Sequence, residues 1–129
     1  MPKKPKSSTV LVIEDDADIR NFTSRVLELE GCAVFQAETS EAGLRLIKKH
    51  DISLVMLDLR LPGENGWTLL EKMKGDENTS AIPVIVFTAS VAASQRQRAL
   101  DMGAAGYLVK PLSASILRDT VQRILRRGT

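Results

Sequence analysis

The sequence predicts an α/β domain built on a doubly wound, five-stranded parallel sheet. Five apolar segments alternate with five segments of helical periodicity, and four of the apolar segments are nearly continuous apolar runs. Such runs are typical of parallel strands that helices cover on both faces. Right-handed crossovers then place helices on both sides of the sheet. A length of 129 residues suits a single domain.

The expected strands are short and end in or beside polar residues. They lie at residues 9–14, 32–37, 52–59, 81–89 and 105–110. The third, "ISLVMLDL", has the clearest pattern of a buried strand. Pro83 falls near the start of the fourth, where a missing backbone donor is tolerated.

The first helix is expected directly after the first strand. Asp16 is placed to cap its N-terminus, and Asp18 in its first turn complements the helix dipole. Its apolar positions are Ile19, Phe22, Val26 and Leu29. These four residues are expected to face the sheet.

The other helices follow the remaining strands in turn. The second is expected over residues 40–50 with Ser40 as its cap, and the third over residues 67–74. The fourth covers residues 90–103 and ends at Gly103, which suits a left-handed C-cap. The fifth begins near Ser113 and places four apolar residues on one side: Leu117, Val121, Ile124 and Leu125.

Composition and charge exclude several classes of protein. The net charge of +2 is too small to indicate nucleic-acid binding, and no apolar run approaches the roughly 18 residues of a membrane span. Cys32 is the only cysteine, so no intrachain disulfide forms, and a reduced, cytoplasmic setting is expected. Residues 1–8 lack the apolar segment of a signal peptide and are expected to form a disordered basic tail.

Polar residues terminate four of the expected strands. Glu14 and Asp15 end the first, Asp58 ends the third, Thr88 ends the fourth and Lys110 ends the fifth. Ligands of doubly wound sheets bind beyond the carboxyl ends of the strands. We therefore expect these five side chains to converge on one pocket.

Three carboxylates in one pocket repel one another, by ~4 kcal/mol for two charges ~4 Å apart at a dielectric of about 20. Such a cluster holds protons or recruits a cation, and oxygen ligands without nearby His or Cys favour Mg²⁺ over zinc. Lys110 adds a positive charge and Thr88 a hydroxyl donor, which together suit a phosphoryl group. Asp58 can then act as a phosphoryl acceptor.

Four motifs, in order and correctly spaced, make the chain similar to a known family. They are "VLVIEDDADIR", "LVMLDLRLPGENGW", "IPVIVFTAS" and "ALDMGAAGYLVKPL". Over about residues 9–127, the chain resembles the receiver domain of bacterial two-component response regulators. The resemblance implies a flavodoxin-like (βα)5 domain with strand order 2-1-3-4-5.

The resemblance also implies roles for individual residues. Asp58 is the implied phospho-acceptor, and Thr88 and Lys110 bind the phosphoryl oxygens. Tyr107 is the implied switch residue, and the Lys110–Pro111 bond is expected to be cis. The implied ligands of Mg²⁺ (or Mn²⁺) are Glu14, Asp15, Asp58 and the backbone carbonyl of Arg60.

The implied function is signalling. A sensor histidine kinase or a phosphotransfer protein donates a phosphoryl group to Asp58, and the chain catalyses only its own phosphorylation and dephosphorylation. The Thr88 hydroxyl then moves to the phosphoryl group and Tyr107 turns inward. The face formed by the fourth helix, fifth strand and fifth helix thereby changes its preference for a downstream output domain or protein.

The expected partners do not include DNA or a membrane. No helix-turn-helix segment follows the fifth helix, so we expect no direct nucleic-acid binding by these residues. We expect a monomer or a phosphorylation-dependent dimer. Whether the chain stands alone stays open, since Met1 and the lysine tail favour a true start, whereas "RILRRGT" ends where a linker would begin.

Three details depart from the family pattern or stay open. The loop after Asp58 reads "PGENG" at residues 62–66 in place of the common "P-x-M-D-G"; its glycines predict flexibility and its glutamate adds a charge. Arg60 and Ser90 hold positions that tune phosphoryl lifetime in the family, and Arg60 either reaches over the phosphoryl group or points to solvent. Trp67 is expected to pack on the third helix or nearby loop, or else to line the acidic pocket.

Three other functions fit parts of the pattern less well. A haloacid-dehalogenase-type phosphatase needs a second aspartate where this chain has Arg60. A flavodoxin-like cofactor binder needs a Gly- and hydroxyl-rich loop after the first strand, where this chain has acids that repel a flavin phosphate. A degenerate receiver that only binds proteins is disfavoured because all five site positions are filled.

Overall fold

The molecule is built around one parallel sheet of five strands. The computed structural model describes residues 8–61 and 65–127, and for Arg127 the backbone only. The strands are β1 (Thr9–Ile13), β2 (Ala33–Ala37), β3 (Leu54–Leu57), β4 (Val84–Thr88) and β5 (Gly106–Val109). Their order is β2-β1-β3-β4-β5 and every pairing is parallel, which confirms the predicted fold class.

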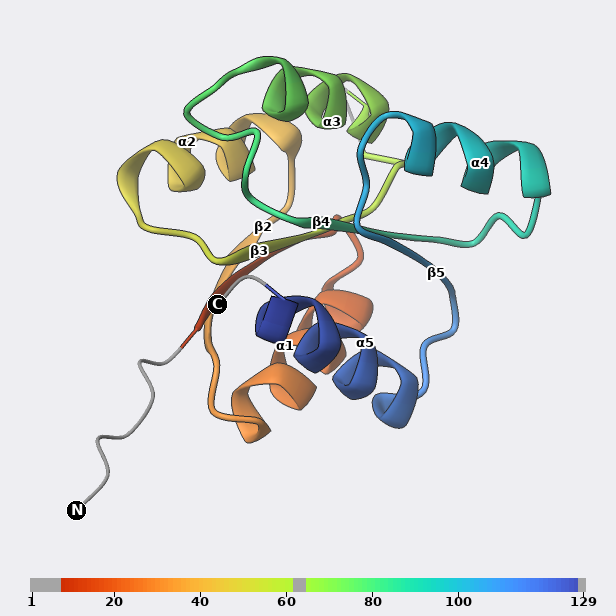
Figure 1. Ribbon diagram of the computed structural model, residues 1–129. Helices are drawn as coiled ribbons and strands as arrows, with labels where there is room; N and C mark the ends of the chain where they lie inside the picture. The colour runs from red at the N-terminus through yellow and green to blue at the C-terminus, as the bar shows by residue number, and fades with distance from the viewer. Residues whose placement is uncertain (1–7, 62–64, 128–129) are drawn as a thin grey trace.

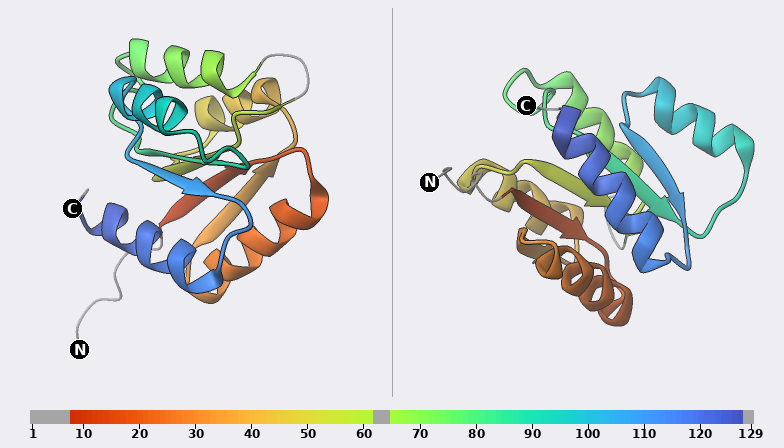
Figure 2. Two further views of the ribbon diagram at one scale, coloured as in Figure 1. Left: turned by 90° about the vertical axis from the view of Figure 1, so that its right-hand side faces the viewer. Right: turned by 60° about the horizontal axis from the view of Figure 1, so that its bottom comes forward.

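Five helices cover the two faces of the sheet. They are α1 (Ala17–Leu29), α2 (Ser40–Lys49), α3 (Gly66–Gly75), α4 (Ala93–Asp101) and α5 (Ala114–Arg127). Figure 1 shows α1 and α5 below the sheet and α2, α3 and α4 above it. The two further views in Figure 2 agree on this arrangement.

Alternating side chains of the strands divide the core into two layers. Leu11 and Ile13 of β1 belong to a buried cluster that includes residues of α2, α3 and α4. Val10 and Val12 belong to a second cluster with residues of α1 and α5. This alternation follows from the two-residue period of a strand, and it explains why β1, β3 and β4 are apolar on both faces.

The predicted apolar face of α1 is partly wrong. Phe22 and Leu29 were expected to face the sheet, but they are 44% and 68% exposed. The buried stripe of α1 instead consists of Arg20, Thr23, Ser24, Val26 and Leu27. Because three of these residues are polar, the apolar pattern alone placed the stripe out of phase. On α5, by contrast, Leu117, Val121 and Ile124 are buried as predicted.

The helix caps match the predictions with one correction. Asp16 caps α1, and its Oδ1 accepts a hydrogen bond from the Ile19 amide at 3.1 Å. Thr39, and not Ser40, caps α2 by accepting from the Ala42 amide at 3.1 Å; Ser40 is buried in the first turn. Gly103 follows α4 with φ of +101°, in the predicted left-handed conformation.

Some predictions fall outside the described residues or are refined by them. Most of the expected basic tail at residues 1–8 lies outside the described ranges. The first part of the "PGENG" loop, residues 62–64, lies wholly outside them. The fourth helix is shorter than the predicted 90–103 and begins at Ala93. Among the described helices, none combines the length and the apolar character that a membrane span requires.

Gly66 begins α3 and lies against the backbone that follows β3. A Cβ atom at this position would lie 2.4 Å from the Asp58 carbonyl oxygen and 2.7 Å from the Leu59 Cα atom. Its amide also donates to the Leu59 carbonyl at 3.1 Å. Gly66 is therefore needed for a close approach of two backbone segments, which is a different reason from the flexibility predicted from the sequence.

We expect Gly66→Ala to destabilise the protein by about 1–3 kcal/mol, because neither backbone contact can move without shifting the segment after β3. Gly75→Ala is the matched control at the other end of α3, where a Cβ would meet nothing within 4 Å. The control should stabilise by up to about 1 kcal/mol. Urea denaturation of both variants measures the difference, and equal stabilities would contradict the steric argument.

Candidate functional site

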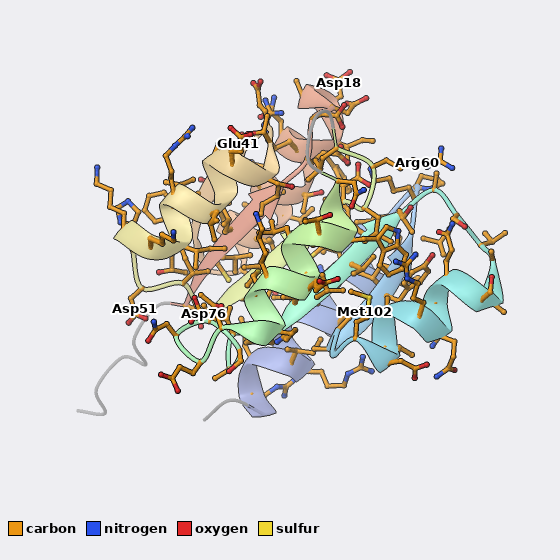
Figure 3. All side chains as sticks on the ribbon, turned by 90° about the horizontal axis from the view of Figure 1, so that it is seen from above. Asp18, Glu41, Asp51, Arg60, Asp76 and Met102 are labelled. Carbon is orange, nitrogen blue, oxygen red and sulfur yellow. The ribbon has the colours of Figure 1, made fainter. Side chains whose placement is uncertain are left out.

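The polar residues at the strand ends meet at one end of the sheet. Glu14 follows β1, Asp58 follows β3 and Lys110 follows β5. Figure 3, a view onto α2, α3 and α4, labels Asp18 and Arg60 toward this end and Asp51 at the opposite end of the molecule. The convergence expected from parallel strands is therefore present in the structure.

Backbone hydrogen bonds extend the sheet to the two buried acids. The Glu14 amide donates to the Ala37 carbonyl at 3.0 Å, and the Asp58 amide donates to the Ile13 carbonyl at 3.1 Å. Both residues thus continue the pairing of their strands by one position. The direction of their side chains is set by the sheet and does not depend on a free loop.

Three carboxylates form a compact cluster at this position. One oxygen each from Glu14, Asp15 and Asp58 lie within 4.8 Å of one another. Glu14 is 0% exposed and Asp58 is 4% exposed, whereas Asp15 is exposed. The cluster therefore combines two buried carboxylates with one that faces solvent, and it offers only oxygen ligands.

Lys110 neutralises part of this charge. Its Nζ atom donates to Asp58 Oδ2 at 3.0 Å and is in direct contact with Glu14 Oε1. The lysine is held in place from its own backbone, since its amide donates to the Thr88 carbonyl at 2.8 Å. One ammonium group therefore bridges acids that follow two different strands.

The environment shifts the pKa values of both Glu14 and Lys110. Burial raises the pKa of Glu14 to about 7; the hydrogen bond from Lys110 opposes this shift, and Asp58 adds to it. Burial alone would lower the pKa of Lys110, but its hydrogen bonds to Glu14 and Asp58 outweigh that effect and the pKa is raised. Lys110 accordingly stays charged at neutral pH, while Glu14 exchanges its proton near neutrality.

The segment after β4 links Thr88 to Tyr107 through Ser90. Thr88 is 1% exposed, and its Oγ1 atom accepts from the Ser90 amide at 3.4 Å. The Tyr107 hydroxyl donates to the Ser90 carbonyl at 3.0 Å. Tyr107 lies on β5 and is half-buried. Both residues that the sequence singled out as switch candidates therefore contact the same short segment.

The open alternatives for Arg60 and Trp67 are resolved in part. Arg60 is exposed, and its amide donates to Asp58 Oδ1 at 3.0 Å. Trp67 packs against the core cluster under α2, α3 and α4, in agreement with the packing prediction. The Arg98 guanidinium of α4 lies over its ring at 4.1 Å from the centroid. The Lys110–Pro111 bond is cis, as the resemblance implied.

Arg20 is the residue near the site that sequence reasoning missed. Its guanidinium is buried and donates to the backbone carbonyls of Glu14 and Asp15 at 2.9 and 3.4 Å. The signal was present in the sequence, because Arg20 lies one helical turn before Thr23 and Ser24 on the same stripe of α1. A search for apolar periodicity does not detect this buried stripe of α1, because its first member is an arginine.

A shallow apolar hollow of about 520 Å³ lies beside the site. It is formed between α1 and the segment that follows β5, and Lys110 lies at its border. Its main apolar lining residues are Ile19, Phe22, Pro111 and Leu112. The exposed Phe22 that departs from the predicted core face of α1 therefore contributes to a surface next to the carboxylates.

The ligand set fits Mg²⁺ better than a transition metal. The cluster contains carboxylates only, and among the described residues no histidine or cysteine joins it. Hard oxygen ligands of this kind suit Mg²⁺ or Mn²⁺, and Mg²⁺ retains several waters and binds few carboxylates. Because Asp15 is exposed while Glu14 and Asp58 are buried, the solvent-facing side of the cluster has room for such waters.

Comparison with known proteins gives a consistent result. The sequence pattern of the response regulator receiver domain family matches residues 10–122. The phosphate regulon transcriptional regulatory protein PhoB of Pseudomonas aeruginosa is 34% identical over 119 residues, which cover 92% of this chain and 52% of that protein. The KDP operon transcriptional regulatory protein KdpE of Escherichia coli is 38% identical over 120 residues, with 93% and 52% coverage.

Solved structures agree in fold. A two-component response regulator from Clostridium difficile superposes with a TM-score of 0.87 at 30% identity, covering 94% of this chain and 98% of that one. A CheY-like receiver domain protein from Methanospirillum hungatei gives 0.88 at 28% identity, with 95% and 97% coverage. The chain spans about half the length of the curated relatives it matches. Since the family pattern extends over most of the chain and the fold agrees with it, this chain belongs to the response regulator receiver domain family.

Proposed function

We propose that the chain takes a phosphoryl group from a sensor histidine kinase or a phosphotransfer protein onto Asp58 in an Mg²⁺-dependent reaction. One observation carries the proposal. The Asp58 carboxylate is buried at the end of the central strand, is bonded to a lysine ammonium, and shares a cation-sized site with Glu14 and Asp15. Nucleophile, positive charge and metal ligands thus occupy one pocket.

Each oxygen of Asp58 has a defined partner. Oδ1 accepts from the Arg60 amide at 3.0 Å, and Oδ2 accepts from Lys110 at 3.0 Å. In the proposed step, one carboxylate oxygen forms a bond to phosphorus while the bond from phosphorus to the donor imidazole nitrogen breaks. The two fixed donors hold the carboxylate in place for in-line attack.

The surrounding residues stabilise the transferred group. Lys110 is already charged and close, so it neutralises phosphoryl oxygens without a large rearrangement. The Thr88 hydroxyl supplies a further donor from β4. Glu14, Asp15 and Asp58 would hold the Mg²⁺, which supplies charge neutralisation when it is bound. Membership of the receiver family adds the Arg60 backbone carbonyl to the proposed ligands. The chain in this account catalyses only its own phosphorylation and dephosphorylation.

The response is expected to pass through Ser90. Movement of the Thr88 hydroxyl toward a phosphoryl group would alter the segment that Tyr107 holds through the Ser90 carbonyl. That segment leads directly into α4, and Tyr107 lies on the neighbouring strand β5. The surface of α4, β5 and α5 is thus the proposed output face, whose preference for an output domain or protein depends on phosphorylation.

The donor protein is expected to approach over the apolar hollow. Lys110 and residues of α1 line the hollow, so a donor that occupies it brings its phosphohistidine next to the cluster. The relatives PhoB and KdpE carry names of transcriptional regulators. The proposed output is therefore a domain or protein that acts downstream; the cytoplasmic location and the oligomeric state stay predictions.

Asp58→Asn should abolish labelling by acetyl phosphate in the presence of Mg²⁺, because the neutral amide lacks the anionic carboxylate oxygen that attacks phosphorus. Intact-protein mass spectrometry measures the added phosphoryl group. Asp51→Asn is the matched control, since Asp51 is an exposed aspartate at the opposite end of the molecule. The control should be labelled as the parent is. Undiminished labelling of Asp58→Asn would rule out this residue as the acceptor.

Mg²⁺ affinity should depend on pH through Glu14. Below about pH 7 most folded molecules carry a proton on Glu14, and a metal ligand has to lose that proton. The affinity should therefore fall up to about tenfold per pH unit below 7 and level off above about pH 8. Titration calorimetry measures both the affinity and the proton release. Glu14→Gln should bind more weakly but without this pH dependence; an unchanged slope would assign the proton to another group.

Asp15 and Asp16 should separate chemistry from stability. Asp15→Asn removes a member of the carboxylate cluster and should weaken Mg²⁺ binding about tenfold or more. Asp16→Ala removes the α1 cap and should cost about 1 kcal/mol of unfolding free energy while Mg²⁺ binding is retained. Calorimetry and urea denaturation of both variants test this, and loss of Mg²⁺ binding in a folded Asp16→Ala protein would reverse the assignment.

A further inference from the structure

Arg20 is a buried cation to which the proposed reaction gives no role. It is 9% exposed and lies in the first turn of α1, where the helix dipole disfavours a positive charge. Burial of its guanidinium adds a desolvation penalty. Both effects oppose an arginine at this position, so its contacts have to account for its placement.

The contacts of Arg20 reach two separate segments. Nη1 donates to the Glu14 carbonyl at 2.9 Å and to the Asp15 carbonyl at 3.4 Å. Nε donates to Gln36 Oε1 on β2 at 3.1 Å, and Nη2 lies 3.5 Å from Glu38 Oε1. The fixed fork of a guanidinium is therefore divided between the turn after β1 and the edge strand of the sheet.

The ion pair is the weakest of these contacts. The Glu38 side chain is 72% exposed and its distance from the guanidinium is long, so the pair contributes little. The shorter bonds go to two uncharged oxygens, the backbone carbonyl of Glu14 and the side-chain amide oxygen of Gln36. The Arg20 guanidinium is thus held mainly by uncharged carbonyl oxygens, and two of these are the backbone carbonyls of Glu14 and Asp15.

Those carbonyls belong to two residues of the carboxylate cluster. Because each peptide unit is planar, fixing the carbonyls of Glu14 and Asp15 fixes the peptide planes that follow both Cα atoms. The Glu14 amide is already fixed by its bond to Ala37. The backbone that directs both carboxylates is therefore set before any cation arrives.

We propose that Arg20 is a positioning residue that presets the backbone of Glu14 and Asp15 for divalent cation binding. The inference rests on the proposed function, which places Mg²⁺ at these carboxylates. Ligands held in the bound arrangement need not be ordered by the metal, so the ordering cost is removed from the binding step. Outer residues of this kind commonly change metal affinity by 10–100-fold.

Arg20→Lys tests the proposal because it keeps the charge and removes the fork. A single ammonium group cannot reproduce bonds from separate nitrogens to the turn and to Gln36. We expect Mg²⁺ affinity, measured by titration calorimetry on folded protein, to fall about tenfold. Arg25→Lys is the matched control, an exposed arginine on the same helix, and should bind Mg²⁺ as the parent does.

Stability is measured separately, so that positioning can be told from folding. Urea denaturation with and without Mg²⁺ should show that the ion stabilises Arg20→Lys less than it stabilises the parent at the same concentration. Parental Mg²⁺ affinity in folded Arg20→Lys would overturn the inference, even if that variant were less stable. Failure of the parent itself to bind Mg²⁺ would instead overturn the proposed function.

Gln36→Leu decides the question if Arg20→Lys does not fold. Gln36 is exposed on the edge strand, so this change leaves the core intact while it removes the acceptor that orients the guanidinium. We expect a smaller loss of Mg²⁺ affinity, about threefold, in the same direction. Unchanged affinity in this variant would overturn the inference.

Discussion

The contact of Lys110 with Glu14 and Asp58 is the interaction on which the site depends. Two buried carboxylates that close together are unstable as a pair of anions, and one ammonium group bonded to both offsets their repulsion. Only β4 lies between β3 and β5 in the sheet, and the Thr88 carbonyl at the end of β4 holds the Lys110 amide. The lysine side chain can therefore reach both acids. The strand order therefore determines the charge balance of the pocket.

The same contact between Lys110 and the two acids explains why the pocket is suited to bind a cation, an anion or a proton. A buried ion pair that rests on one bridging cation contributes little net stability, because desolvation of its members offsets their attraction. Any cation that binds the acids, or any anion that binds the ammonium, enters a site whose groups are already desolvated and aligned. Glu14, with its pKa near neutrality, can take up or release a proton as this balance changes.

Much of this arrangement could be predicted from the sequence, and the exceptions have a common cause. The strands and the convergence of Glu14, Asp58 and Lys110 follow from apolar runs and from polar strand ends, whereas the strand order was implied by the resemblance to receiver domains. The buried face of α1 could not be read in this way, since the Arg20 guanidinium faces inward only because a carbonyl of the turn after β1 and the Gln36 side chain of β2 accept its hydrogen bonds. Such tertiary partners leave no periodic apolar signal.

Rigid and adjustable parts of the site are supplied by different kinds of backbone. Glu14 and Asp58 are fixed by bonds that extend the sheet, so their geometry changes only if the sheet changes. Thr88, at the end of β4, and Tyr107 meet instead at Ser90, in a segment without regular structure that joins β4 to α4. That segment has fewer bonds to lose than a strand, so it can rearrange while the carboxylates stay in place. In the proposed mechanism, phosphorylation of the fixed Asp58 would therefore alter the surface of α4 and β5 through this segment without disturbing the core.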